Sequence, residues 1–414
     1  MAKERVLIVA VNLSNKNKDH FESSLEELVS LTNTAGGTVA HVMTQNRDRI
    51  HPAYYIGFGK LNEIKLQVEA MDIDLVISND ELSSGQLRNL ITHIGVRVID
   101  RSQLILDIFA SRAKTKEGKL QVELAQLQYI LPRLHGQGRE LSRLGGGIGT
   151  RGPGETKLET DQRHIRRRID DIKRRLKLVV EQRHQYRKRR KTNESFQIAV
   201  VGYTNAGKST IFNRLTDSGS LEEDKLFATL DPLTRQVRLP SGFETLITDT
   251  VGFIQDLPTT LIAAFRSTLE EASEADFIIH VVDGSHPDME QHQKTVMGLL
   301  HELEADGIPM LTVYNKQDKF PRDIIPMYYP YFMMSALLPD DMKGFLNKIE
   351  DTLKDEWDTY HVKLEPEKGY LLHKLSRETI IDKREFNEEE NNYDVSGFIR
   401  SEHPLHHRLV KGEY

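Results

Sequence analysis

The first 112 residues alternate between two hydrophobic periodicities, that of a strand and that of a helix. Apolar runs predict strands at residues 5–11, 38–43, 74–78 and 96–99, and amphipathic stretches predict helices at 21–31, 59–70, 83–93 and 101–111. Strands that alternate with helices of this length favour a parallel sheet with helical crossovers. We therefore expect residues 1–112 to form a small α/β domain.

Two later stripes of apolar residues have the 4-3-4-3 spacing of a coiled-coil seam. The first consists of leucines at positions 120, 124, 127, 131 and 134, and the second of Ile165, Ile169, Ile172, Leu176 and Val179. They predict an antiparallel helical hairpin within residues 113–192, with arms near 117–134 and 160–191. At ~1.5 Å per residue the second arm is ~48 Å long and the first ~27 Å, so the second extends past its partner.

The net charge of −6 hides a strongly basic hairpin. Residues 161–191 contain fourteen Lys or Arg against four Asp or Glu, and residues 135–157, between the arms, contain eight glycines. A solvated helix face and a flexible linker are the plain alternatives. Glycine combined with arginine instead favours close contact with the phosphates of structured RNA. The candidate RNA contacts are Arg139, Arg143, Arg151, Lys157, Arg166, Arg167 and Arg168.

Residues 202–209, GYTNAGKS, match the phosphate-binding pattern G-x-x-x-x-G-K-[ST]. The segment lies between an apolar strand at 196–201 and a helix at 210–215, so its backbone N–H groups can surround phosphate oxygens at a helix N-terminus. Lys208 is expected to reach the β- and γ-phosphates, and Ser209 to offer its hydroxyl to Mg²⁺. The alternative for this motif alone is an ordinary glycine-rich turn. The expected phosphate-binding residues are Gly202, Tyr203, Thr204, Asn205, Ala206, Gly207, Lys208, Ser209 and Thr210.

A second motif, DTVG at residues 249–252, ends an apolar strand that begins at position 246. Asp249 can hold Mg²⁺ directly or through water, and the Gly252 N–H can meet the γ-phosphate. Thr250 and Val251 are expected beside the nucleotide as well. The motif follows the phosphate-binding loop in the order that a nucleotide-hydrolysing domain requires.

Two further segments indicate which base is bound. NKQD at 315–318 follows a predicted strand, and Ser335-Ala336 follows another. Asp318 can accept hydrogen bonds from two N–H groups of guanine that adenine lacks, and a site built on such bonds can reject the wrong ligand by ~10⁴-fold or more. Asn315, Lys316, Ser335 and Ala336 complete the expected guanine site. Together the motifs predict a GTPase domain at residues 196–356 that hydrolyses GTP to GDP and phosphate.

Residues 226–235 occupy the place of switch I, the loop that binds Mg²⁺ only in the GTP state. We expect Thr229 to be the Mg²⁺ ligand; Thr234 is the alternative, and either could be an ordinary polar loop residue. Phe227 and Ala228 are expected beside the nucleotide. The expected catalytic set is therefore Lys208, Thr229 and Gly252.

Two positions bear on the mechanism. Position 253, directly after DTVG, is Phe where Ras-like enzymes place the Gln that orients water. A phenyl ring cannot hydrogen-bond water, so we expect slow intrinsic hydrolysis that depends on outside help. Asn205 can ligate K⁺ where an arginine finger would otherwise stabilise charge; the alternative is a turn residue that tolerates an unusual backbone.

Composition sets outer limits. The chain has 414 residues and no cysteine, which excludes disulfides, thiolate metal sites and a Cys nucleophile. No stretch approaches ~18 apolar residues, and the N-terminal apolar run is too short for a signal peptide. We therefore expect a cytoplasmic protein with no membrane partner. His403, His406 and His407, the densest histidines, are expected in a solvated tail rather than at a metal. Residues 357–414 are expected to form a small C-terminal domain with short strands.

The sequence GGGIGTRGPGETKLETDQR at 145–163, followed by GYTNAGKST, LFATLDPLTR, DTVGF and NKQD, resembles the HflX family of GTPases over nearly the whole chain. The resemblance implies that the protein binds the large ribosomal subunit with its 23S-type rRNA and splits stalled or idle 70S ribosomes under stress. It also implies that the hairpin tip approaches the peptidyl-transferase region, and that GTP hydrolysis times release. Some relatives bind ATP through the N-terminal domain, but no residue here carries that property over.

A second function class fits the same motifs. In a GTP-gated RNA-binding or ribosome-assembly module, the nucleotide would only switch affinity and no splitting would occur. A tRNA-modifying GTPase fits less well, because the sequence shows no second catalytic constellation. For a ribosome-splitting factor and for a GTP-gated RNA-binding or assembly module alike, we expect a monomer that binds GTP or GDP, with Mg²⁺ as cofactor and K⁺ as a candidate second ion. The expected fold is α/β: a P-loop GTPase domain preceded by a small α/β domain and a helical hairpin and followed by a small C-terminal α/β appendage.

Overall fold

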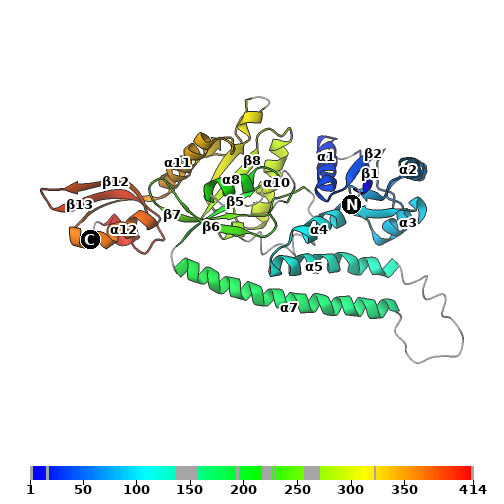
Figure 1. Ribbon diagram of the computed structural model, residues 1–414, viewed down its shortest axis with the longest axis horizontal. Coiled ribbons are helices and arrows are strands. Elements are labelled where there is room, and N and C mark those ends of the chain that lie inside the picture. Colours follow the sequence, from blue (N-terminus) through cyan, green and yellow to red (C-terminus); the bar gives the residue numbers. More distant parts are fainter. Residues whose placement is uncertain are drawn as a thin grey trace. The chain divides into compact units, whose positions relative to one another are not determined.

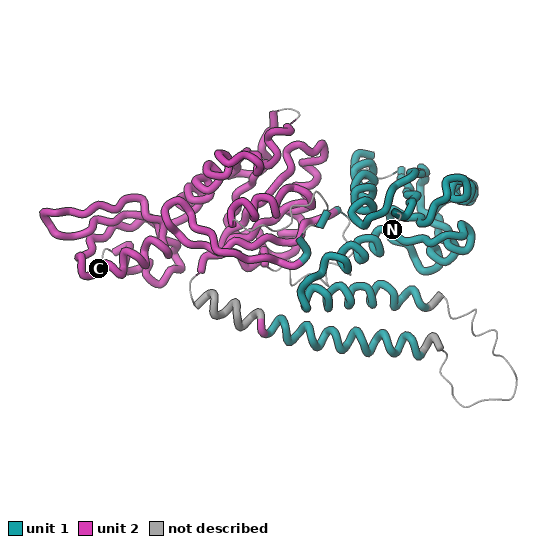
Figure 2. Tube along the Cα trace, viewed as in Figure 1, with its two compact units in different colours: residues 1–181, 225–230, 255–266 teal, residues 182–224, 231–254, 267–414 magenta. Residues whose placement is uncertain are grey.

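The structure is a computed structural model that describes residues 3–14, 18–136, 157–192, 195–216, 226–227, 229–255, 271–320 and 323–411. For residues 135–136, 157–159 and 183–192 it describes the backbone only. The chain falls into two compact units, coloured separately in Figure 2. Unit 1 consists of residues 1–181, 225–230 and 255–266, and unit 2 of residues 182–224, 231–254 and 267–414.

Unit 1 begins with a four-stranded parallel sheet in the order β2-β1-β3-β4, with helices between consecutive strands. Figure 1 labels β1 and β2 together with the helices α1, α2, α3 and α4. The strands are β1 (Arg5–Leu13), β2 (Thr38–Arg47), β3 (Leu75–Ser78) and β4 (Arg97–Asp100), and the helices are α1 (Lys18–Thr34), α2 (Phe58–Met71), α3 (Ser84–Ile94) and α4 (Arg101–Arg112). All eight elements expected from the hydrophobic periodicity are confirmed. Residues 6–11 of β1 are consecutively buried, as in a central parallel strand that is covered on both faces.

The helical hairpin of unit 1 is also confirmed. Its first arm is α5 (Lys116–Ile130), continued by a 3₁₀ turn (Leu131–Gly136), and its second arm is α7 (Lys157–Thr192). The two apolar stripes pack together in a buried cluster that contains Leu120, Leu124, Ile169 and Ile172. With 36 residues, α7 is longer than the 15-residue α5, as the sequence predicts.

Unit 2 is built on a six-stranded sheet in the order β10-β9-β8-β5-β7-β6, in which β6 is antiparallel to β7 and the other pairs are parallel. The strands are β5 (Phe196–Gly202), β6 (Leu233–Arg238), β7 (Glu244–Asp249), β8 (Phe277–Asp283), β9 (Met310–Asn315) and β10 (Tyr331–Met333). The helices are α8 (Lys208–Thr216), α10 (Met289–Glu302) and α11 (Pro339–Glu356), with a short 3₁₀ helix at Gln317–Lys319.

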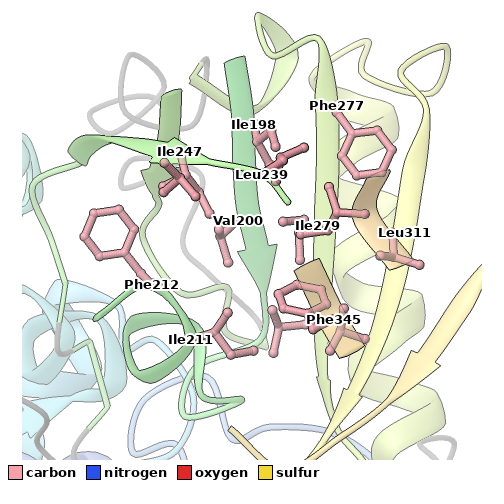
Figure 3. Close-up of a cluster of buried hydrophobic side chains, with 14 of the residues drawn as sticks. Ile198, Val200, Ile211, Phe212, Leu239, Ile247, Phe277, Ile279, Leu311 and Phe345 are labelled. Atoms are coloured by element: carbon pink, nitrogen blue, oxygen red, sulfur yellow. The ribbon is translucent and has the colours of Figure 1, made fainter. Parts of the chain in front are cut away.

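Alternation of side chains along β5 separates two hydrophobic layers. Ile198 and Val200 pack with side chains of α8 and α11, and Figure 3 shows this cluster gathered against the strands. Ala199 and Val201 pack on the opposite face, with side chains of α10. The sheet is therefore covered on both faces, which leaves its edge at the carboxyl ends of the parallel strands as the place for a ligand.

The C-terminal residues of unit 2 form a three-stranded antiparallel sheet in the order β11-β13-β12. Its elements are β11 (Asp358–Leu364), a 3₁₀ turn (Pro366–Lys368), α12 (Gly369–Glu378), β12 (Ile380–Asn387), β13 (Asn392–Ile399) and α13 (His406–Val410). Ile380 belongs to the same core cluster as β5, and Arg377 forms an ion pair with Glu244 of β7 at 2.6 Å. The appended sheet thus shares a core with the larger one.

The expectation of a solvated histidine tail is wrong for His403 and His406, whereas His407 is exposed. His403 is 4% exposed, and its Nδ1 accepts a hydrogen bond from the Leu405 N–H at 3.2 Å. His406 Nε2 pairs with Asp358 Oδ2 at 2.8 Å. Burial lowers the pKa of His403 to about 4. No helix among the residues that the structure describes has the length and apolarity needed to cross a membrane.

Candidate nucleotide-binding site

The loop at residues 202–207 joins the carboxyl end of β5 to the start of α8. Three of its residues have positive φ: Gly202 at +152°, Asn205 at +61° and Gly207 at +96°. A Cβ on Gly202 would lie 2.2 Å from the Val281 carbonyl oxygen, and one on Gly207 would lie 2.2 Å from Asn315 Nδ2. The motif's two glycines are therefore required by close contacts with β8 and β9 as well as by backbone conformation.

Lys208 is buried beneath this loop. Its Nζ donates hydrogen bonds to the carbonyl oxygens of Gly202, at 3.0 Å, and of Tyr203, at 2.7 Å. Burial lowers the pKa of Lys208 to about 8. A Cβ on Gly252 would lie 3.0 Å from that Nζ and 2.8 Å from Thr204 Cγ2, so a side chain at position 252 would crowd both. The structure thus brings together Lys208 and Gly252, two of the three expected catalytic residues.

Ser209 and Asp249 also meet at this edge of the sheet, because Ser209 Oγ donates to Asp249 Oδ2 at 2.8 Å. A hydroxyl and a carboxylate oxygen so close together are the kind of ligands that Mg²⁺ takes from a protein when phosphates and water supply the rest. No group of three or more His, Cys, Asp or Glu side chains suited to a metal occurs in the described part of the chain.

The base-recognition segments are held together by one side chain. Asn315 Nδ2 donates to the Ala206 carbonyl at 2.9 Å, and its Oδ1 accepts from the Ala336 N–H at 2.9 Å. The NKQD segment is further fixed by a hydrogen bond from the Gln317 N–H to the Met334 carbonyl at 3.1 Å. Asn315 of NKQD therefore connects the phosphate-binding loop at 202–209 to the Ser335-Ala336 segment. It lies between the part of the site expected to bind phosphates and the part expected to bind the base.

Asp283 and Asp318, the two acidic residues near the expected guanine site, differ in their surroundings. Asp283, at the end of β8, accepts from Lys316 Nζ at 2.7 Å and from Ser285. Burial alone would raise the pKa of Asp283, but the hydrogen bonds from Lys316 and Ser285 and the Lys316 charge outweigh it, so its pKa is below the ordinary value. Asp318 is exposed in the 3₁₀ helix and forms no hydrogen bond or ion pair with the described residues. Of the two, Asp318 is the carboxylate available to a ligand.

The segment expected to be switch I, residues 226–235, ends inside a strand. Residues from Leu233 onward belong to β6, where Thr234 Oγ1 hydrogen-bonds with Thr248 Oγ1 at 2.9 Å. Thr234 is thus a strand residue engaged with β7, whereas Thr229 precedes the strand. The expected switch I thus overlaps the start of β6, because the antiparallel pairing with β7 begins at Leu233.

Thr229 itself belongs to unit 1, whereas Ser209 and Asp249 belong to unit 2. Two residues earlier, Phe227 has φ +56° and is 2% exposed, with its ring edge-on to that of Phe109 in α4 at a centroid distance of 4.6 Å. The Leu226 N–H donates to Thr34 Oγ1 at 3.3 Å. The Phe227 side chain is therefore packed against α4, and Ala228 lies outside the described residues.

Phe253 lies in the core. It is 3% exposed and packs in the cluster that contains Tyr203 and side chains of α10. Its N–H donates to the Gly202 carbonyl at 3.1 Å, and its carbonyl accepts from the Thr204 N–H at 2.8 Å. Phe253, at the position of the water-orienting Gln, thus connects the segment after DTVG to the phosphate-binding loop.

His292 of α10 contacts the phosphate-binding loop, because its ring stacks on that of Tyr203. No sequence motif predicts this contact. A lone histidine on an amphipathic helix carries no signal of its own, and its partner is remote in sequence. Likewise, no motif marks Asp283 as the partner of Lys316.

The RNA candidates differ in how much the structure says of them. Arg139, Arg143 and Arg151 lie outside the described residues, as does the side chain of Lys157. Arg166 and Arg167 are exposed on α7. Arg168 instead forms two hydrogen bonds with Glu123 of α5, at 2.6 and 2.9 Å, so it joins the two arms.

Comparison with known proteins assigns the family. Three family models match the chain in succession: "GTP-binding GTPase N-terminal" at residues 22–110, "GTP-binding GTPase Middle Region" at 112–190 and "50S ribosome-binding GTPase" at 197–316. GTPase HflX of Alkalihalophilus pseudofirmus is 54% identical over 95% of this chain and 93% of its own length. The chain belongs to the HflX family of GTPases. GTPase HflX of Escherichia coli is 45% identical over 77% of this chain and 74% of its own length.

A solved structure agrees with this HflX assignment. The crystal structure of a protein called SsGBP in complex with GDP is similar over 84% of this chain and 98% of its own, with a TM-score of 0.50 and 25% identity. This member of the HflX family is accordingly an α/β P-loop GTPase that binds guanine nucleotides and hydrolyses GTP.

Proposed function

We propose that this GTPase binds the large ribosomal subunit as a monomer through its basic hairpin, splits stalled or idle 70S ribosomes under stress, and uses GTP hydrolysis to time its release. The distribution of charge on α7 carries the proposal. The apolar stripe of α7 packs against α5, whereas Arg166, Arg167, Lys173 and Lys177 are exposed. Cations on the free face of a helix suit the phosphate backbone of 23S-type rRNA, because neutralising phosphates releases bound counterions.

The family supports the same partner. The model matched by residues 197–316 is described as a 50S ribosome-binding GTPase. A ribosomal partner also agrees with a cytoplasmic location.

For the nucleotide, we assign Mg²⁺ to Ser209 and Asp249, joined by Thr229 in the GTP state. Mg²⁺ would neutralise charge on the β- and γ-phosphates. Lys208 would exchange its two carbonyl partners for phosphate oxygens, and Asp318 would accept the two guanine N–H groups. The glycine at position 252 leaves room for the γ-phosphate beside Lys208.

Hydrolysis is expected to be slow without the ribosome. The Phe253 ring is packed in the core and has no group that could orient water, so the missing polar group must come from elsewhere. Asn205 is exposed with φ +61°, and we assign it the K⁺ site. Equal GTPase rates in K⁺ and Na⁺ would exclude that assignment and leave the rest intact.

Sedimentation of 70S ribosomes with the protein and GTP tests the proposal. We expect conversion to free subunits by the wild type and none by the Lys208→Ala variant, which lacks the phosphate-binding ammonium. The second candidate, a GTP-gated RNA-binding or assembly module, would bind subunits in a GTP-dependent manner and leave 70S particles intact. That result would contradict splitting and favour the alternative.

A further inference from the structure

Arg133 is a basic residue of the hairpin that faces the N-terminal sheet. It lies in the 3₁₀ turn after α5, and its side chain is 13% exposed. Its Nη1 donates to the Tyr129 carbonyl at 2.9 Å, and the guanidinium lies over the Tyr129 ring, 3.5 Å from the centroid. Its Nη2 donates to the Leu82 carbonyl at 2.9 Å and to Glu81 Oε1 at 3.0 Å. One side chain thus connects the end of α5 nearest the hairpin tip, which we call its far end, to the loop between β3 and α3.

Asp100, the last residue of β4, completes this connection. Its side chain is fully buried, and its Oδ2 accepts a hydrogen bond from Arg133 Nη2 at 3.3 Å. The same carboxylate accepts from the Leu82 N–H at 3.0 Å and caps α4 by accepting from the Gln103 N–H at 2.9 Å. Burial raises the pKa of Asp100, and the Arg133 charge opposes that rise by favouring the ionised form. The 3₁₀ turn, the loop before α3 and the start of α4 therefore form one polar network.

The opposite end of α5 is fixed by the chain itself. Residues 113–115 join α5 to α4, and within them Ala113 is buried, with its N–H bonded to the Phe109 carbonyl at 2.9 Å. Thr115 caps α5, because its Oγ1 accepts from the Gly118 N–H at 2.9 Å. Helix α5 is thus attached to the N-terminal domain at both ends, and α7 packs on α5 through the apolar seam.

Attachment at both ends prevents α5 from pivoting. Without Arg133, the far end of α5 would lose its polar attachments to the sheet, and the helix could rotate about residues 113–115. At ~1.5 Å per residue, a rotation of about 10° there would move the far end of this 15-residue helix by ~4 Å. The far end leads into the segment of the hairpin that is expected to contact RNA. A pivot would therefore absorb movement that should be passed to the RNA.

We propose that Arg133 is the positioning residue of the hairpin: it fixes the far end of α5 to the N-terminal sheet, so that hairpin and N-terminal domain move as one rigid lever. The inference rests on the proposed function, because the splitting of ribosomes is the step that needs a rigid lever. Arg133 differs from the candidate RNA contacts in that it faces the sheet. Its loss should therefore impair what the hairpin does once bound, and not how tightly it binds.

The direct test measures whether the hairpin pivots in the full chain. Because the native sequence has no cysteine, Glu69→Cys in α2 and His164→Cys in α7 provide two unique and exposed sites for spin labels. Double electron–electron resonance then gives the distribution of distances between the labels. We expect one narrow distribution with Arg133 and a broader one with Arg133→Ala. Arg133→Lys keeps a positive charge beside Asp100, which protects folding, but it lacks the planar fork and should broaden the distribution as well.

The functional test compares the same variants in the splitting of 70S ribosomes at equal ribosome occupancy. Arg133→Ala and Arg133→Lys should both split several-fold more slowly than the wild type. Binding to purified large subunits should stay close to wild type, because the Arg133 side chain faces the sheet. The intrinsic GTPase rate should also be unchanged, because every contact of Arg133 lies in unit 1. If thermal unfolding shows that Arg133→Ala does not fold, Arg133→Lys decides the test.

Lys119→Ala is the matched control, because it removes an exposed cation from α5 and leaves the polar network intact. It should keep the narrow distribution and the wild-type rate of splitting. The inference is overturned if the wild-type distribution is already broad, if neither substitution of Arg133 broadens it, if Lys119→Ala broadens it equally, or if broadening leaves splitting unchanged. Failure of the proposed function looks different: the wild type would leave 70S particles intact, and the distance distribution would still depend on the residue at position 133.

Discussion

The rings of Tyr203 and His292 are stacked face to face, with centroids 3.7 Å apart and planes that differ by 6°. Burial lowers the pKa of His292 to about 3, with the nearby His286 adding to the effect, so the stacked imidazole is neutral. The carbonyl of Tyr203 accepts from Lys208, and Tyr203 pairs with Phe253 in an isolated bridge. Helix α10 therefore supports the phosphate-binding loop through one ring.

His292→Ala should remove that support. The loss of stacking and the cavity left behind should lower the free energy of unfolding by ~1–3 kcal/mol. GTP turnover should fall several-fold, because the phosphate-binding loop, to which Tyr203 belongs, loses a contact with α10. Chemical denaturation and steady-state GTPase assays measure the two effects. His292→Phe keeps a ring without a titratable group and should restore both; a wild-type turnover rate for His292→Ala would contradict the role.

Lys208 predicts how GTP affinity depends on pH. In the nucleotide-free protein its pKa is about 8, because burial disfavours the ammonium. Phosphate oxygens favour the charged form, so above that pH the protein must take up a proton to bind GTP. Below pH 8 the ionisation of Lys208 should therefore leave the Kd for GTP unchanged. Above pH 8 that Kd should rise by up to about tenfold per pH unit. Calorimetry in buffers of different ionisation enthalpy measures the proton uptake. The Lys208→Ala variant should bind more weakly, with no such rise; the same rise in that variant would assign the effect to another group.

Asp318→Asn should weaken GTP binding by ~1.5–3 kcal/mol, because a charged acceptor is removed from two donors. Preference should shift toward xanthine nucleotides, in which a carbonyl replaces the exocyclic amine. Gln317→Ala, at the exposed neighbouring position, is the control and should bind GTP normally. Unchanged GTP affinity in Asp318→Asn would show that NKQD does not read the base.

The arginines of α7 should separate into two classes. Reversing the charge of exposed Arg166 and Arg167 should weaken ribosome association. It should also reduce the slope of the logarithm of the binding constant against the logarithm of the salt concentration by nearly one for each lost phosphate contact. Arg168→Ala should leave the salt slope unchanged, because Arg168 is paired with Glu123. Association measured over a series of salt concentrations distinguishes the two. An equal change of slope in both variants would place Arg168 among the RNA contacts.

Much of the fold could be predicted because its determinants are local. The two-residue period of strands and the 3.6-residue period of helices predicted every strand and helix of the N-terminal α/β domain. The phosphate-binding motif is recognised from neighbouring residues, among them Gly207 and Lys208. The 4-3-4-3 stripes predicted the pairing of α5 with α7, since a helix with an apolar seam must cover it.

What could not be predicted depends on contacts between distant residues. The sequence 226–235 looks like one loop, and only pairing with β7 turns Leu233–Arg238 into a strand. His403 looks solvated until the C-terminal sheet surrounds it. Arg168 is indistinguishable from Arg166 in sequence, and only the position of Glu123 on the facing helix gives it an ion-pair partner there.

Asn315 binds the Ala206 carbonyl with one end of its amide and the Ala336 N–H with the other. One planar group, which cannot stretch, thereby sets the spacing between the segment that holds phosphates and the segment that holds the base. We therefore expect the site to select ligands by length as well as by chemistry: a guanine separated from its phosphates by anything other than one ribose should not reach both ends.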